Sequence, residues 1–140
     1  MSPSKKQISE QFDKLAGLSG LLAYVYTVAL IEWKRRYPAG PRPMLDSTYR
    51  TDVQQQALYD QGRTKPGRIV TFAKPGQSKH NRYPSTAFDV KFVYQDGSVD
   101  WNPELFEDFN DCVQMVDADI VWGGLWPKPK TDLPHWQLNS

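Results

Sequence analysis

The segment Ala87–Tyr94 reads AFDVKFVY and is soon followed by the pair Asp96-Gly97. β-Branched and aromatic residues dominate the segment, as is typical of a strand. An Asp-Gly pair is a strong signal for a two-residue hairpin turn. We therefore expect a strand over Ala87–Tyr94 that turns back into Val99–Trp101. The elements on either side of this hairpin set the fold class.

Helices are predicted on both sides of the hairpin. Upstream, apolar spacing indicates a short amphipathic helix over Ser9–Ala16, then a helix buried on most sides that ends near Arg36. Downstream, Asn102 and Pro103 are residue types that begin a helix. An apolar stripe follows at helical spacing, formed by Leu105, Phe109, Cys112, Val113 and Val116.

Shorter elements complete the prediction. Met44–Tyr49 has a strand pattern, and Thr51 can cap a helix over Asp52–Asp60. Ile69–Ala73 is expected to be a short strand or an extended segment, and Pro134–Leu138 the last strand. Helices, then strands, a helix and a final strand predict an α+β fold. We expect one small domain over residues 1–140, with an antiparallel sheet and helices packed on it.

Composition is that of an ordinary globular protein. The chain has 140 residues, of which 39% are hydrophobic and 24% charged. A net charge of +1 gives no reason to expect a nucleic-acid or anionic-lipid partner. The single cysteine, Cys112, excludes an intrachain disulfide and a thiolate metal cluster. It lies on the apolar stripe and is interpreted as core rather than as a nucleophile. A monomer without a separate binding module is expected.

No cleavable signal peptide is expected, because Lys5-Lys6 is followed by polar residues rather than by an apolar run. Leu18–Ile31 contains no charged residue, but it is shorter than the roughly 20 residues that a spanning helix needs. We favour a buried helix there and predict no stable membrane span. A signal-anchor that releases from the membrane is the alternative.

Only two histidines occur in the chain, and each lies in a segment that suits half of a zinc site. Zinc hydrolases typically use three nitrogen or oxygen ligands and leave the fourth position to water. His80, Asp89 and His135 fit that count, and strand alternation lets Asp89 and His135 face one cleft. Asp132, on a turn fixed by Pro134, is then left as a candidate general base.

Four motifs surround these residues: Ser78-Lys79-His80, Ala87-Phe88-Asp89, Trp122-Gly123-Gly124-Leu125-Trp126 and Asp132-Leu133-Pro134-His135-Trp136. Upstream of them lie Arg50, Gln55 and Leu58-Tyr59. In this combination the sequence resembles the zinc peptidases related to D-alanyl-D-alanine carboxypeptidases. More specifically, it resembles the L-alanyl-D-glutamate endopeptidases found as phage endolysins and bacterial wall hydrolases. The resemblance covers roughly residues 48–138.

The resemblance implies that His80, Asp89 and His135 bind Zn²⁺ and that Asp132 is the catalytic base. It also implies that Arg50 pairs with a substrate carboxylate or with the developing oxyanion, a surface ion pair being the alternative. The expected substrate contacts are Ser78, Arg50, Gln55 and Trp122. Because Gln54, Gln55 and Gln56 are consecutive, the sequence leaves open which of them matches the glutamine of the family. For Trp122 to Trp126, a cleft wall and a buried core are equally good interpretations.

The sequence departs from the family pattern in one place. The spacer that contains Tyr83-Pro84-Ser85 is two residues longer than in many members, so we expect a different substrate fit near His80. The carboxypeptidase branch usually has Glu at the base position, and Asp132 therefore favours the endopeptidase branch.

The implied function is hydrolysis of a peptide bond in the peptidoglycan stem, with L-alanyl-D-glutamate as the expected bond. The expected setting is a phage endolysin, made in the host cytoplasm and then released to the cell wall. A D-alanyl-D-alanine carboxypeptidase or dipeptidase is the alternative among enzymes. A non-catalytic, zinc-stabilised peptidoglycan-binding module is the alternative from another class.

Overall fold

A five-stranded antiparallel sheet organises the protein, seen in a computed structural model that describes residues 3–140. The elements in chain order are α1 (Lys5–Ala16), α2 (Gly20–Arg36), β1 (Arg42–Ser47), α3 (Asp52–Asp60), the 3₁₀ turn η1 (Lys79–Asn81), β2 (Ala87–Val93), β3 (Val99–Asp100), α4 (Pro103–Gln114), β4 (Ile120–Trp122), the 3₁₀ turn η2 (Gly123–Leu125) and β5 (His135–Leu138). The predicted α+β fold is confirmed.

Strand β2 lies at the centre of the sheet. The strand order is β1-β2-β5-β4, and β3 pairs with β2 to one side, as predicted for the hairpin. Phe88, Val90 and Phe92 alternate along β2 and are fully buried. Asp89 lies between them and so faces the opposite side of the sheet. The register places Asp89 directly across from His135 on β5.

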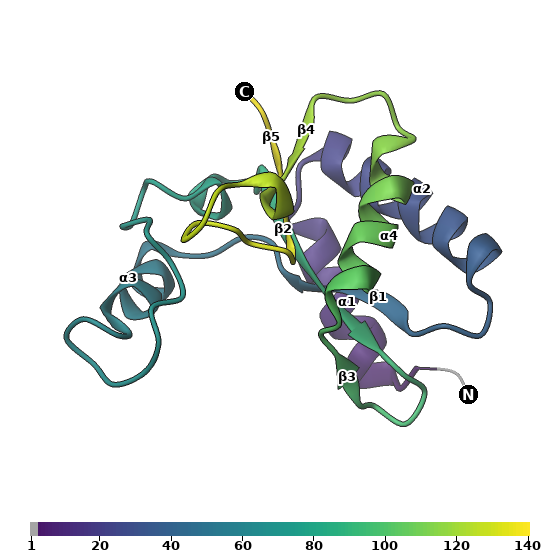
Figure 1. Cartoon of the computed structure of the whole chain (residues 1–140), viewed down its shortest axis with the longest axis horizontal. Coiled ribbons are helices and arrows are strands. Elements are labelled where there is room, and N and C mark those ends of the chain that lie inside the picture. The colour runs from purple at the N-terminus through teal and green to yellow at the C-terminus, as the bar shows by residue number, and fades with distance from the viewer. Residues whose placement is uncertain (1–2) are drawn as a thin grey trace.

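Helices α2 and α4 lie together over one face of the sheet (Figure 1). Ser19 caps α2, and Asn102 caps α4 with Pro103 at its first position. Between helices and sheet the core is largely aromatic. Many of its rings meet edge-on or tilted, such as Trp33 at 5.2 Å from Phe92, and Trp136 stacks on Phe88.

Helix α3 and the loop after it project from the rest of the molecule (Figure 1). We call residues 52–82 the arm. Thr51 caps α3 in a reciprocal capping box with Gln54. Ile69–Ala73, for which a strand or an extended segment was expected, joins no strand of the sheet. Side chains bind its carbonyls instead, because Gln55 Nε2 donates to Ala73 and Arg63 donates to Thr71.

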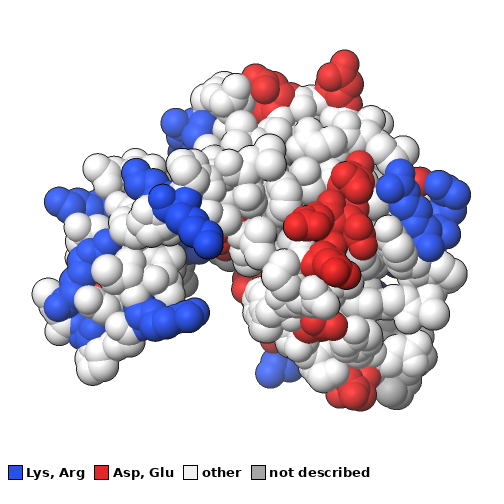
Figure 2. Space-filling model, in the orientation of Figure 1, with Lys and Arg blue, Asp and Glu red and all other residues white. Residues whose placement is uncertain are grey.

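Charges are segregated on the molecular surface. In Figure 2 Lys and Arg gather on the arm and in a second group at the right edge, whereas Asp and Glu gather over α4. A net charge of +1 therefore conceals two regions of opposite sign.

Several element boundaries differ from the prediction. Helix α1 begins at Lys5, before the expected Ser9, because Ser4 and Gln7 form a capping box there. Strand β1 begins at Arg42 and ends before Tyr49. Strand β4 was not predicted, since three residues are too few to show a pattern.

The stripe of α4 is confirmed at Phe109, Cys112 and Val113, which are fully buried. Phe106, absent from the predicted stripe, is buried as well. No helix among residues 3–140 is long and apolar enough to cross a membrane.

Candidate active site

Three side chains from different elements converge on one point. His80 comes from η1, Asp89 from β2 and His135 from β5. His80 Nε2 lies 3.2 Å from Asp89 Oδ1 and 3.2 Å from His135 Nδ1, and His135 Nδ1 lies 3.0 Å from Asp89 Oδ1. Among residues 3–140, these three form the group of His, Cys, Asp and Glu side chains that can hold a metal ion.

In each histidine, a hydrogen bond of the outer ring nitrogen determines that the other nitrogen faces the site as an acceptor. His80 Nδ1 lies 2.7 Å from the Thr48 carbonyl oxygen, which can only accept a hydrogen bond. His135 Nε2 lies 2.9 Å from Gln137 Oε1, which likewise accepts. In neutral rings the two facing nitrogens therefore carry lone pairs. Together with the Asp89 carboxylate they present three acceptors to one position, an arrangement that a cation satisfies.

In this cluster, burial and the neighbouring charges shift the pKa values of the side chains in opposite directions. Burial alone would raise the pKa of Asp89, but the charges of both imidazoles and hydrogen bonds to them outweigh it and hold that pKa well below its usual range. Burial alone would lower the pKa of His135. The hydrogen bond to Asp89 and the negative charge of Asp89 raise this pKa instead. The site thus favours an ionised carboxylate.

Arg50 lies beside Asp89, on the side away from the histidines. Its NH2 is 3.7 Å from Asp89 Oδ2 and 3.2 Å from Ser47 Oγ. Its NH1 donates to Gln55 Oε1 at 2.8 Å. Gln55 is fully buried, and its amide joins Arg50 to the Ala73 carbonyl. Hydrogen bonds to Gln55 and Ser47 therefore hold the guanidinium in place where it lines the cleft.

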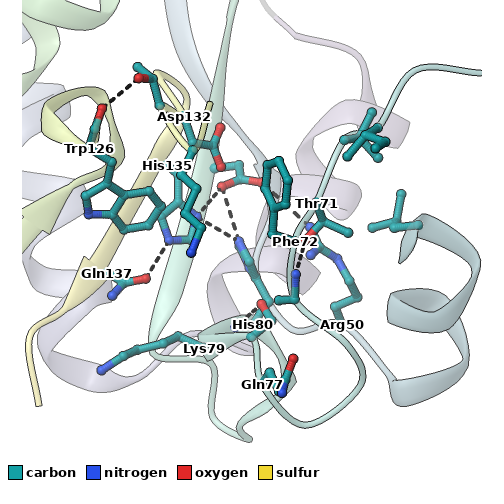
Figure 3. A pocket seen from close by; sticks show the side chains of 18 of the residues that line it. Arg50, Thr71, Phe72, Gln77, Lys79, His80, Trp126, Asp132, His135 and Gln137 are labelled. Carbon is teal, nitrogen blue, oxygen red and sulfur yellow. Dashed lines mark hydrogen bonds and ion pairs between the residues drawn. The ribbon is translucent and has the colours of Figure 1, made fainter. Parts of the chain in front are cut away.

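Asp132 lies on the loop that leads into β5 and faces the same cleft (Figure 3). Its backbone N–H donates to the Gly123 carbonyl at 2.9 Å. A Cβ added at Gly123 would lie 2.4 Å from the Asp132 carbonyl oxygen, so only glycine allows this approach. Burial, and then the nearby Asp89 carboxylate, raise the pKa of Asp132 above its ordinary value.

The cleft around these groups has a volume of about 630 Å³, within the range of ligand sites. Phe72 and Thr71 on the arm form one wall, and Trp126 lies on the other beside His135 (Figure 3). The Trp126 and His135 rings are 5.2 Å apart. The cleft thus joins an apolar wall to a polar floor, a combination that suits a peptide.

The other residues predicted to contact substrate occupy different positions. Ser78 lines the cleft, and its hydroxyl accepts a hydrogen bond from the His80 backbone N–H. Gln55 does not line the cleft itself, but it bonds to Arg50 and Ala73, which do. Trp122 is buried and stacks on Trp136, whereas Trp126 of the same motif lines the cleft. Trp122 therefore fits the buried-core interpretation of that motif, and Trp126 fits the cleft-wall interpretation.

Sequence reasoning missed several residues of the cleft. Gln137 lies two residues after His135 on the predicted last strand, so both share one face, and that alternation was the signal that could have identified Gln137 as a partner of the ring. Nothing in the sequence indicated that Phe72 and Thr71 line the cleft, because the pattern of an isolated extended segment does not reveal which part of the protein it contacts. Cys112 is buried in the core, as predicted, and burial raises the pKa of its thiol.

The longer spacer after His80 is anchored to the fold. Ser85 is buried, and its hydroxyl donates to the Thr48 carbonyl, which also accepts from His80. The Ser85 backbone bonds to Gly17 and Ser19. Tyr83 is 72% exposed, so the extra length lies at the surface.

The chain is similar to two proteins of known activity. Over 97 residues it is 37% identical to the peptidoglycan L-alanyl-D-glutamate endopeptidase CwlK of Bacillus subtilis (strain 168), covering 64% of this chain and 56% of CwlK. The crystal structure of the L-Ala D-Glu endopeptidase ChiX of Serratia marcescens matches with a TM-score of 0.67 and 22% identity, over 92% of this chain and 86% of that chain. No known family profile matches the chain.

These similarities confirm the resemblance predicted from the motifs. The chain spans a little more than half the length of CwlK. At 22% identity, the likeness to ChiX shows the fold alone.

Proposed function

We propose that this chain is a zinc-dependent peptidase that cleaves the L-alanyl-D-glutamate bond of the peptidoglycan stem. One observation carries the proposal: His80, His135 and Asp89 turn three acceptor atoms toward one point, in a cleft that also holds Asp132. The activity of CwlK, which is 37% identical, supports the choice of substrate.

Zinc fits the three acceptors by chemistry and by spacing. Two imidazole nitrogens and a carboxylate oxygen are typical ligands of catalytic zinc. Ligand bonds of about 2.0–2.1 Å in a tetrahedron separate neighbouring ligand atoms by about 3.3 Å. The observed separations are 3.0–3.2 Å. When bound, zinc would polarise the scissile carbonyl and lower the pKa of the attacking water.

Asp132 has the position of a general base. Its carboxylate faces the cleft, and no side-chain hydrogen bond among residues 3–140 occupies it. It would take a proton from the attacking water and deliver that proton to the leaving amine. Gly123 holds the backbone of Asp132 in place through the 2.9 Å bond to its N–H.

Arg50 has two tasks in this proposal. Its contact with Asp89 Oδ2 keeps Oδ1 turned toward the histidines. Its positive charge, held in the cleft by Gln55, would also stabilise the negative charge that develops on the scissile oxygen. Trp126 and Phe72 would hold the stem peptide between the two walls and limit the access of water to it.

The proposal includes two finer points from the sequence. We propose that the chain acts as a catalytic domain, and that cleavage serves lysis of a bacterial host by a phage. The second point is tested by producing the chain in bacterial cytoplasm together with a membrane-permeabilising protein. A rapid fall in culture turbidity that needs both proteins would support it.

The test of the activity is mass spectrometry of purified peptidoglycan fragments after incubation with the protein, with and without a zinc chelator. We expect chelator-sensitive release of a stem peptide that begins with D-glutamate. Release of terminal D-alanine would instead indicate a carboxypeptidase. Zinc binding without any product would indicate a peptidoglycan-binding module.

A further inference from the structure

The arm carries an excess of positive charge beside the cleft. Among residues 52–82 there are two acids, Asp52 and Asp60, and six cations, namely Arg63, Lys65, Arg68, Lys74, Lys79 and Arg82. The whole chain has 17 Lys and Arg against 16 Asp and Glu, so 11 cations and 14 acids remain outside the arm. The segregation in Figure 2 therefore follows from the sequence as well as from the fold.

No Lys or Arg of the arm forms an ion pair with an Asp or Glu of residues 3–140, although Lys79 and Arg82 donate to the Ser140 carbonyl oxygen. The ion pairs that Lys and Arg form among residues 3–140 belong to Lys6, Arg35, Arg36, Arg50 and Lys91, all outside the arm. A surface that served only solubility would mix both signs, whereas a field of one sign steers a charged partner.

One arm cation has a structural task. Arg63 stacks on the Tyr59 ring at 3.8 Å and donates to the carbonyls of Tyr59 and Thr71. Lys65 and Arg68 differ, because the hydrogen bonds that they form in the described chain use backbone atoms only. The Lys65 N–H donates to the Asp60 carbonyl, and the carbonyls of Lys65 and Arg68 accept from Gly62 and Gln61. Both side chains are exposed, so their charges are free for a partner.

The free cations flank the cleft. Arg68 immediately precedes Ile69–Ala73, the segment that lines the cleft on the arm side. On the opposite wall Lys130 lines the cleft, and Lys128 lies close to it in the same exposed loop. A polyanion that contacts Arg68 and Lys130 together would therefore cross the cleft. The acidic face over α4 repels the same polyanion, so the charge pattern also orients the molecule (Figure 2).

We propose that the arm, through Lys65 and Arg68, binds carboxylates on stem peptides next to the one being cleaved, on the same peptidoglycan polymer. This inference rests on the proposed function, since a stem that contains glutamate carries negative charge and recurs along the polymer. Binding outside the cleft would hold the polymer by several weak contacts and raise its effective concentration at the cleft.

The experiment compares a long and a short substrate. The double variant Lys65→Gln/Arg68→Gln is assayed on insoluble peptidoglycan stripped of phosphate polymers and on a soluble single stem peptide. We expect kcat/KM on the polymer to fall by about threefold to tenfold at low salt, and less at high salt. Cleavage of the single stem should not change. Thermal stability should not change either, because both residues are exposed and neither side chain forms a hydrogen bond or ion pair within residues 3–140.

Two control variants isolate the effect. Lys5→Gln/Lys6→Gln removes the same charge from exposed positions on α1 and should cleave both substrates at the parent rate. Lys65→Arg/Arg68→Lys keeps the charge and should retain polymer cleavage. Equal loss in the two Gln double variants would show an effect of net charge alone and overturn the proposal.

Two other results would also overturn it: an equal loss on polymer and single stem, or a loss only on walls that retain phosphate polymers. If the parent cleaves neither substrate, the proposed function fails. Sedimentation of the intact chain with stripped peptidoglycan then still tests the arm, since Lys65→Gln/Arg68→Gln should remain in the supernatant at salt that leaves the parent bound.

Discussion

His80 and His135 face the candidate metal position through different ring nitrogens, Nε2 and Nδ1. The difference follows from their partners, the Thr48 carbonyl behind one ring and Gln137 behind the other. Each partner accepts a hydrogen bond from the N–H of the outer nitrogen and leaves the inner nitrogen as an acceptor. A backbone carbonyl and a side-chain amide outside the cluster thus determine which nitrogen each histidine presents.

The role of Asp132 can be separated from that of the ligands. Asp132→Asn should retain bound zinc, because Asp132 does not belong to the His80, Asp89 and His135 cluster. Its turnover should fall by about 10²–10⁴-fold, the usual contribution of a general base. His80→Ala should lose both zinc and turnover. Metal content and stem-peptide hydrolysis measure the two effects, and full activity in Asp132→Asn would disprove the base assignment.

Gly123 is predicted to be required for the placement of Asp132. In Gly123→Ala the new Cβ would lie 2.4 Å from the Asp132 carbonyl oxygen, so the loop must shift. We expect a loss of about 1–3 kcal/mol in the free energy of unfolding and at least a tenfold loss in kcat. Denaturant unfolding and peptide hydrolysis give these values.

Gly20→Ala is the matched control for this substitution. No atom lies within 4 Å of a Cβ added at Gly20, which is the first residue of α2. Stability and kcat should therefore equal those of the parent or exceed them slightly. Parent-like kcat in Gly123→Ala would show that the loop adjusts without moving Asp132.

At the scale of elements, the arm is held by side chains rather than by a sheet. Gln55 is fully buried in α3, and its amide bonds to Arg50 and to the Ala73 carbonyl. Arg63 and Gln61 bind further carbonyls of the loop. Since one wall of the cleft belongs to this loop, the hydrogen bonds of α3 set the width of the cleft.

Three consecutive glutamines allow a matched comparison in α3. Gln55→Ala leaves Arg50 and the Ala73 carbonyl without their partner and creates a cavity. We expect a loss of about 2–4 kcal/mol in the free energy of unfolding and a lower kcat/KM. Gln56 is exposed and bonds only to Asp60, so Gln56→Ala should stay within about 0.5 kcal/mol of the parent. Equal losses in the two variants would refute the structural role of Gln55.

At the scale of the whole molecule, the metal position joins segments far apart in the chain. Asp89 and His135 belong to paired strands, but His80 lies on η1, outside the sheet. A bound ion would therefore tie the segment at the base of the arm to the sheet. It would also relieve the repulsion between three acceptors that face one another.

Zinc should accordingly raise the stability of the fold. An ion at about one hundred times its Kd adds about 2.7 kcal/mol to the free energy of unfolding. Thermal unfolding with zinc and with a chelator should differ by several degrees. His135→Ala should remove the difference, and a difference that persists in this variant would place the stabilising ion elsewhere.

Much of the fold followed from local signals in the sequence. The caps Thr51 and Asn102 indicated where two helices begin, and the Asp96-Gly97 pair marked the hairpin, because these effects depend on neighbouring residues alone. Strand alternation also placed His135 and Gln137 on one face. Strand β4 was missed, since a strand this short depends on its partner.

The candidate site was predicted as a set of residue types, but its construction depends on tertiary contacts. The two histidines and Asp89 could be named from their motifs, whereas the ring nitrogen that each histidine presents is set by Thr48 and Gln137. Likewise, the sequence of the Trp122–Trp126 motif could not show which tryptophan lines the cleft. Residue type determines which chemistry is possible, and long-range packing decides which atoms meet, because only packing brings distant segments to bonding distance.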